Sequence, residues 1–114
     1  MIAVPPALEV YYAATCAPCR LELPVLAAAL REGAPVRVML LTEEKRARAE
    51  LAAISPDLAA QAVAAPAGQD PRIILRQAGD ADGILPFART SCAGWRGTLT
   101  LERIRTLLAG CPRP

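Results

Sequence analysis

The motif C-A-P-C at residues 16–19 lies between a stretch typical of a β-strand and a stretch typical of an α-helix. Residues 8–14 are apolar and rich in β-forming side chains, whereas residues 20–30 have the leucine and alanine content of a helix. Unpaired backbone N–H groups at the start of a helix stabilise a thiolate. A second cysteine one turn further on can then attack a mixed disulfide formed by the first. We therefore expect an α/β protein built around a redox-active cysteine pair.

Composition limits the chemistry that this chain can perform. The 114 residues include four cysteines and no histidine, which removes the usual general base and the commonest zinc ligand. The net charge is +2 and the basic residues are scattered, so we predict no nucleic-acid binding. No apolar stretch is long enough to cross a membrane, and no leader pattern precedes the first strand. The length predicts one domain over residues 1–114.

Hydrophobic periodicity and capping residues predict the order of the secondary structure. Strands are expected over residues 8–12, 35–41, 84–92 and 95–99, the last two joined by a tight turn at Ala93-Gly94. Helices are expected over residues 16–31 (kinked at Pro24), 43–54, 56–64, 71–78 and 101–108, with N-caps at Thr42, Ser55, Asp70 and Thr100. This order predicts an α/β fold with a central mixed four-stranded sheet flanked by helices.

The same order of features resembles the thioredoxin superfamily. The resemblance rests on the strand before the C-x-P-C motif, Pro24 in the following helix, Leu85-Pro86 before the penultimate strand, and the closing hairpin and helix. Residues 79–87 and the helical insert between Leu41 and Asp70 look most like the TlpA-like branch of periplasmic thiol reductases. The resemblance implies a thioredoxin-like fold in which Pro86 follows a cis peptide bond and faces the cysteines. Leu85 and Pro86 would then bind the substrate.

Three features depart from the pattern of that superfamily. Thr15 stands where the family has a tryptophan before the first cysteine, and Val10 stands where thioredoxin has a buried acid. The additional N-terminal strand is missing. Glu9 is the nearest acid on the first strand, but alternation directs it to the opposite face of the sheet from Val10.

These patterns predict a thiol:disulfide oxidoreductase that needs no cofactor or metal. Cys16, at the exposed start of the helix, is expected to attack the substrate disulfide, and Cys19 to release the product. Thr15, Ala17 and Pro18 complete the active-site loop, and Pro18 resembles the motif of reducing thioredoxins. The expected partners are protein or peptide disulfides and an upstream thiol donor, with the protein acting as a monomer. The resemblance places it in the periplasm or tethered to a membrane if a leader was removed, and otherwise in the cytoplasm.

Two questions stay open from the sequence. The cysteine pair could instead belong to a non-catalytic binding module, such as a copper carrier or assembly partner, or to a glutathione-dependent, glutaredoxin-like enzyme. Cys92 and Cys111 could form a structural disulfide, because the last helix returns towards the hairpin that contains Cys92. They could equally be free thiols that pack as small apolar side chains.

Overall fold

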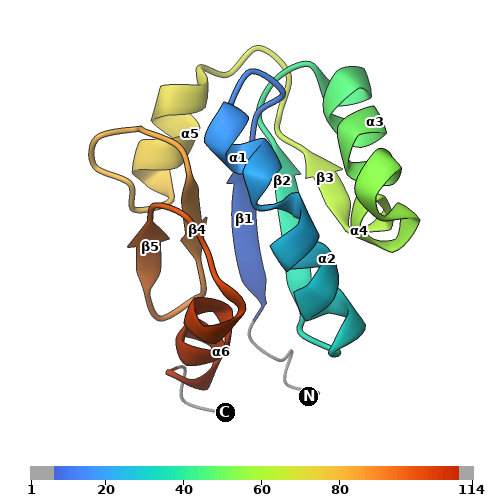
Figure 1. Ribbon diagram of the computed structural model, residues 1–114. Helices are drawn as coiled ribbons and strands as arrows, with labels where there is room; N and C mark the ends of the chain where they lie inside the picture. Colours follow the sequence, from blue (N-terminus) through green and yellow to red (C-terminus); the bar gives the residue numbers. More distant parts are fainter. Residues whose placement is uncertain (1–6, 111–114) are drawn as a thin grey trace, which may run out of the picture.

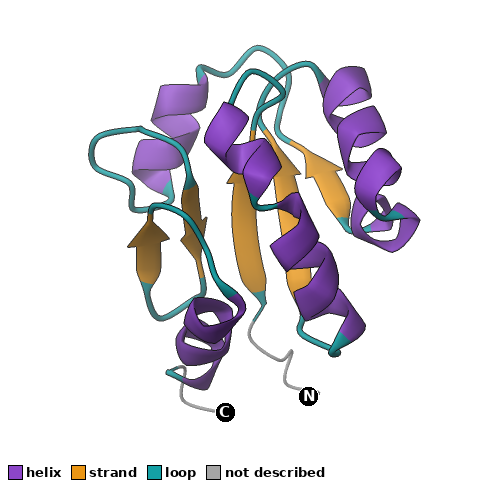
Figure 2. Cartoon of the chain, viewed as in Figure 1, coloured by secondary structure: helices purple, strands orange, loops and turns teal. Residues whose placement is uncertain are grey.

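The computed structural model describes residues 7–110 as a mixed five-stranded sheet flanked by helices (Figures 1 and 2). The elements are β1 Leu8–Tyr12, α1 Ala17–Leu21, α2 Leu23–Arg31, β2 Val36–Leu40, α3 Glu44–Ile54, α4 Pro56–Ala60, β3 Ala62–Ala64, α5 Pro71–Gln77, β4 Phe87–Arg89, β5 Gly94–Arg96 and α6 Leu101–Ala109. The strand order is β3-β2-β1-β4-β5. The first three strands in this order are parallel, and β4 runs antiparallel to both β1 and β5.

The central strand β1 is buried on both faces of the sheet. Leu8, Val10 and Tyr12 pack into the larger apolar cluster, which includes residues of α2, α3 and α6. Tyr11 points the other way and packs in a smaller cluster with Leu75 of α5. Because both faces of β1 are covered, its C-terminal end gives a rigid support to the loop that contains the cysteines.

The helical segment that follows the C-A-P-C motif differs from the single kinked helix that the sequence predicts. It is interrupted at Glu22, which ends α1 and begins α2. Pro24 lies in the first turn of α2, where a missing backbone N–H costs no helical hydrogen bond. Gly33, at a φ of +89°, follows the end of α2, and its N–H donates to Leu30 O at 3.0 Å.

The predicted four-stranded sheet is wrong by one strand. Residues 62–64, which their alanine content assigned to the end of a helix, form β3 and pair with β2 in register Val38↔Ala62 and Leu40↔Ala64. The helix α4 ends at Ala60. Pairing with the outer edge of β2 satisfies backbone groups that would otherwise be left without partners, and this gain outweighs the local helix preference of alanine.

The closing hairpin is shorter than predicted. β4 begins at Phe87 and β5 ends at Arg96. The turn between them is longer than the predicted Ala93-Gly94 turn, and it is closed by a hydrogen bond from Thr90 N–H to Ala93 O at 2.8 Å. Residues 84–86, which were predicted to lie in the strand, therefore belong to the loop before β4. Within residues 7–110, no helix combines the length and the apolar character needed to span a membrane.

Three of the four predicted N-caps are confirmed. The side chains of Ser55, Asp70 and Thr100 accept hydrogen bonds from backbone N–H groups in the first turns of α4, α5 and α6. Thr42 does not cap α3. The residue before this helix is Glu43, whose backbone has a left-handed conformation with a φ of +46°. The Thr42 hydroxyl is instead buried with no hydrogen-bond partner among residues 7–110.

Replacing Thr42 with valine should therefore stabilise the protein. Valine keeps the shape of the side chain and removes the unpaired hydroxyl, so we expect the free energy of unfolding to rise by about 1 kcal/mol in urea denaturation. Thr100→Val is the matched control. It removes the hydroxyl that accepts from Arg103 N–H at 3.1 Å and should lower the free energy of unfolding by about 1 kcal/mol. A loss of stability in Thr42→Val would contradict the assignment of an unpaired hydroxyl.

Candidate redox site

Cys16 and Cys19 form a disulfide at the N-terminus of α1, with their Cα atoms 5.2 Å apart. Cys16 is the N-cap residue, and its Sγ accepts a hydrogen bond from the backbone N–H of Cys19 at 3.2 Å. The two cysteines differ in accessibility, because Cys16 is partly exposed and Cys19 is 2% exposed. An incoming group therefore meets Cys16 first, and the N–H of Cys19 is in place to stabilise negative charge on that sulfur.

The loop before the disulfide is held by backbone contacts and one arginine. Cys16 N–H donates to Ala13 O at 3.0 Å, and Arg20 Nη1 donates to Ala14 O at 2.6 Å. Thr15, Ala17 and Pro18 are exposed, as is Leu21 on the next turn. The exposed residues next to Cys16 in the chain are thus small, and Leu21 adds a large exposed apolar side chain on the next turn.

The loop before β4 lies at the same end of the sheet as the start of α1 (Figure 1). The Leu85-Pro86 peptide bond is cis, and Pro86 O accepts from Gly97 N–H at 3.0 Å. Leu85 is partly buried and packs against the same apolar cluster as Cys16. The structure therefore places both sequence motifs, the cysteine pair and Leu85-Pro86, at one end of the molecule.

Glu22 is a buried acid that the sequence reasoning missed. Its side chain is 2% exposed, and its Oε1 accepts from Leu99 N–H at 2.8 Å. It follows Cys19 by one helical turn, and its own N–H donates to Cys19 O at 3.2 Å. Burial raises the pKa of Glu22 to about 7, and the hydrogen bond from Leu99 opposes this shift only in part. A carboxyl group that titrates near neutral pH thus lies on the turn of chain that follows the buried cysteine.

Comparison with solved structures identifies the architecture. A thioredoxin-related protein from Neisseria meningitidis serogroup B superposes with a TM-score of 0.73 at 16% identity, over 95% of this chain and 85% of that one. StoA from Bacillus subtilis gives a TM-score of 0.66 at 13% identity, over 90% of this chain and 81% of that one. A secreted disulfide oxidoreductase of Mycobacterium tuberculosis, homologous to E. coli DsbE, gives 0.64 at 11% identity, over 94% and 82% of the two chains.

The chain has a thioredoxin-like fold. No protein-family profile and no curated protein matches its sequence. The structural neighbours include StoA and a homologue of E. coli DsbE, and the fold is the one that the resemblance to the thioredoxin superfamily predicts.

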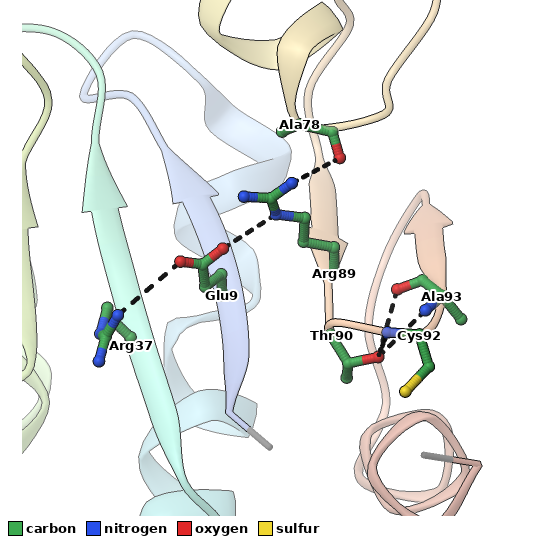
Figure 3. Close-up of polar contacts among 7 residues, drawn as sticks. All are labelled: Glu9, Arg37, Ala78, Arg89, Thr90, Cys92 and Ala93. Carbon is green, nitrogen blue, oxygen red and sulfur yellow. Dashed lines mark hydrogen bonds and ion pairs between the residues drawn. The ribbon is translucent and has the colours of Figure 1, made fainter. Parts of the chain in front are cut away.

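The acid on the first strand of this thioredoxin-like fold does not replace the missing buried acid at Val10. Glu9 lies on the opposite face of β1 from the cluster that contains Cys19, between Arg37 and Arg89 of the neighbouring strands (Figure 3). Arg89 Nε donates to Glu9 Oε1 at 2.9 Å, whereas Arg37 is 3.9 Å from the other carboxylate oxygen. These residues line an open cavity of about 620 Å³ on the far face of the sheet. Glu22 is therefore the buried acid on the side of the sheet that contains the disulfide.

The second pair of cysteines is described only in part. Cys92 is exposed in the turn between β4 and β5, where its backbone N–H donates to Thr90 Oγ1 at 3.2 Å (Figure 3). Cys111 lies outside the described residues, so a Cys92–Cys111 disulfide stays a prediction. Within residues 7–110, no three histidine, cysteine, aspartate or glutamate side chains are grouped as a metal site requires.

Proposed function

We propose that this protein is a thiol:disulfide oxidoreductase that reduces disulfides in protein or peptide substrates. The observation that supports this function is the Cys16–Cys19 disulfide at the start of α1, with one partly exposed and one buried cysteine. The neighbours in the thioredoxin-like fold include a protein described as a disulfide oxidoreductase. The cysteines are catalytic in this proposal, and Thr15, Ala17 and Pro18 form the surface that the substrate approaches.

Catalysis starts from the reduced pair. The Cys16 thiolate attacks one sulfur of the substrate disulfide, so that a mixed disulfide forms and the other substrate sulfur leaves as a thiolate. Cys19, as a thiolate, then attacks Cys16 Sγ, which releases the second substrate sulfur and closes the Cys16–Cys19 disulfide. The substrate gains two electrons and the protein loses two. An upstream dithiol returns the pair to the reduced form.

Glu22 would supply the proton transfer that the second step requires. Cys19 is buried, and a buried thiol needs a base to become a nucleophile. Glu22 follows Cys19 by one helical turn, and its raised pKa, about 7, allows it to take up and return a proton near neutral pH. We infer that Glu22 performs the role that Val10 and Glu9 do not.

The substrate would lie across Cys16 and the loop before β4. Leu85 and Pro86 give this loop an apolar surface beside the start of α1, and an extended peptide can pair with its backbone. The proposed site of action is the periplasm or a membrane surface, because one structural neighbour is described as secreted. The protein would act there as a monomer.

Reduction of insulin by dithiothreitol tests the proposal most directly. The protein should accelerate the reaction, and mass spectrometry should locate the exchange at Cys16 and Cys19. Equilibration with glutathione should show that the Cys16–Cys19 pair has a low reduction potential, as a protein that reduces other disulfides requires. Stoichiometric binding of copper(I) without acceleration of insulin reduction would overturn the proposed function and favour a binding module.

A further inference from the structure

The loop of residues 79–86 holds the two residues that the proposed function places against the substrate. It has no helix or strand between α5 and β4, and both of its glycines have a positive φ, +109° at Gly79 and +64° at Gly83. Ile84 is 57% exposed, so packing of this side chain does not fix the loop. Leu85 packs against both apolar clusters, and the polar groups of the loop make the further contacts that hold Leu85 and Pro86 in place.

Asp80 makes those contacts from a fully buried position. Its side chain is 0% exposed, and its Oδ2 accepts from Ile84 N–H at 3.0 Å. Its Oδ1 accepts from Arg96 Nη2 at 3.3 Å. A buried carboxylate is costly unless each oxygen is paired, and here one oxygen is paired with the loop and the other with β5.

The end of β5 holds the loop at a second point. Arg96 also forms an ion pair with Asp82, but both side chains are exposed, so this pair adds little to the hold on the loop. The next residue, Gly97, donates its N–H to Pro86 O at 3.0 Å. The loop is therefore attached to the edge strand on both sides of Leu85, by Asp80 before it and by Pro86 after it.

We propose that Asp80 is a positioning residue that, through Ile84 N–H and Arg96, holds Leu85 and Pro86 in the conformation that binds a protein disulfide. This inference rests on the proposed function. No polar contact joins Asp80 or Arg96 to either active-site cysteine in the described part of the chain. The role is therefore in recognition of an extended substrate, and the chemistry at Cys16 does not depend on it.

Asp80→Asn and Arg96→Gln test this role with two substrates. Asparagine has one acceptor and one donor where aspartate has two acceptors, so it cannot satisfy both Ile84 N–H and Arg96. Glutamine is too short to reach Asp80 from β5. The KM for insulin should rise about tenfold in both variants, the loss expected for one charge-assisted hydrogen bond. The kcat for insulin and the rate with a small aromatic disulfide, 5,5′-dithiobis(2-nitrobenzoate), should stay at the wild-type level.

Asp82→Asn is the matched control, since Asp82 binds the same arginine from an exposed position. This variant should keep the wild-type KM. An unchanged KM for insulin in folded Arg96→Gln would overturn the role of Asp80, and this variant decides the question if Asp80→Asn does not fold. Equal losses with both substrates, or an equal rise of KM in Asp82→Asn, would also overturn it. A wild-type protein that reduces neither substrate would instead overturn the proposed function on which this role rests.

Discussion

Cys19→Ser protein should form a stable mixed disulfide with insulin and should not turn over. Cys16 remains at the N-cap of α1 in this variant and can still attack a substrate disulfide. The serine hydroxyl cannot displace the substrate sulfur from Cys16, so the reaction stops after the first step. Non-reducing electrophoresis and mass spectrometry should show one insulin chain bound to each protein molecule through Cys16.

Two further variants make the assignment specific. Cys16→Ser should be inactive and should trap no substrate, because Cys19 is 2% exposed and cannot be reached by a protein disulfide. The double variant Cys92→Ser/Cys111→Ser is the matched control, since it removes both cysteines of the predicted second disulfide and neither belongs to the C-A-P-C motif. It should keep wild-type turnover. Trapping of insulin through Cys19 in the Cys16→Ser protein would show that the roles of the two cysteines have been assigned in the wrong order.

Much of the fold could be predicted from interactions between residues that are close together in the sequence. The strand Leu8–Tyr12 has the predicted bounds because its apolar, β-forming residues are buried on both faces. The caps at Ser55 and Thr100 depend only on a hydroxyl and the backbone a few residues away. The Glu44–Arg48 pair on α3, at 3.7 Å, follows equally from the spacing of a helix.

The features that the sequence did not predict depend on distant residues. Ala62–Ala64 becomes a strand only because β2 offers an unpaired edge, and no property of these three residues indicates that partner. Glu22 lies between Cys19 and Pro24, and a glutamate there is typical of an exposed position on a helix. Its burial depends on Leu99, which is far away in the sequence and donates its N–H to the carboxylate. The position of Glu22 one turn after the second cysteine was the only sequence signal available.

Glu22→Gln should slow the release of substrate from the mixed disulfide. Glutamine keeps an oxygen that can accept from Leu99 N–H, so the fold should be retained, but it cannot take up the proton of Cys19. General base catalysis is worth at least about a hundredfold, and we expect a loss of that order in turnover near pH 7. The mixed disulfide should accumulate in single-turnover experiments, whereas the first attack by Cys16 should keep its rate.

Glu32→Gln is the control for this change in charge. Glu32 is an exposed acid at the other end of α2 and binds Arg105 at 2.7 Å. Its replacement should leave turnover unchanged. If Glu22→Gln and wild type release substrate at the same rate across the pH range, Glu22 is not the proton acceptor.

The stability of the oxidised protein should also fall as pH rises through the titration of Glu22. The pKa of Glu22 is raised from 4.5 to about 7, so the folded protein binds a proton at this group over a range in which the unfolded chain has released it. The stabilisation that the folded protein gains from binding this proton is complete below pH 4.5, and it is lost as the pH rises through about 7. A shift of this size corresponds to roughly 3 kcal/mol in the free energy of unfolding.

Urea denaturation of wild type and Glu22→Gln from about pH 4 to about pH 8 isolates this contribution. The difference between the two proteins removes the titration of all other groups that they share. Glutamine does not ionise, so the variant should gain stability relative to wild type as the pH rises. A difference that stays constant over this range would mean that Glu22 keeps an ordinary pKa in the folded protein and is ionised at neutral pH. The carboxylate, one helical turn after the buried cysteine, would then be negatively charged at neutral pH, and its contribution to catalysis could not include the exchange of a proton there.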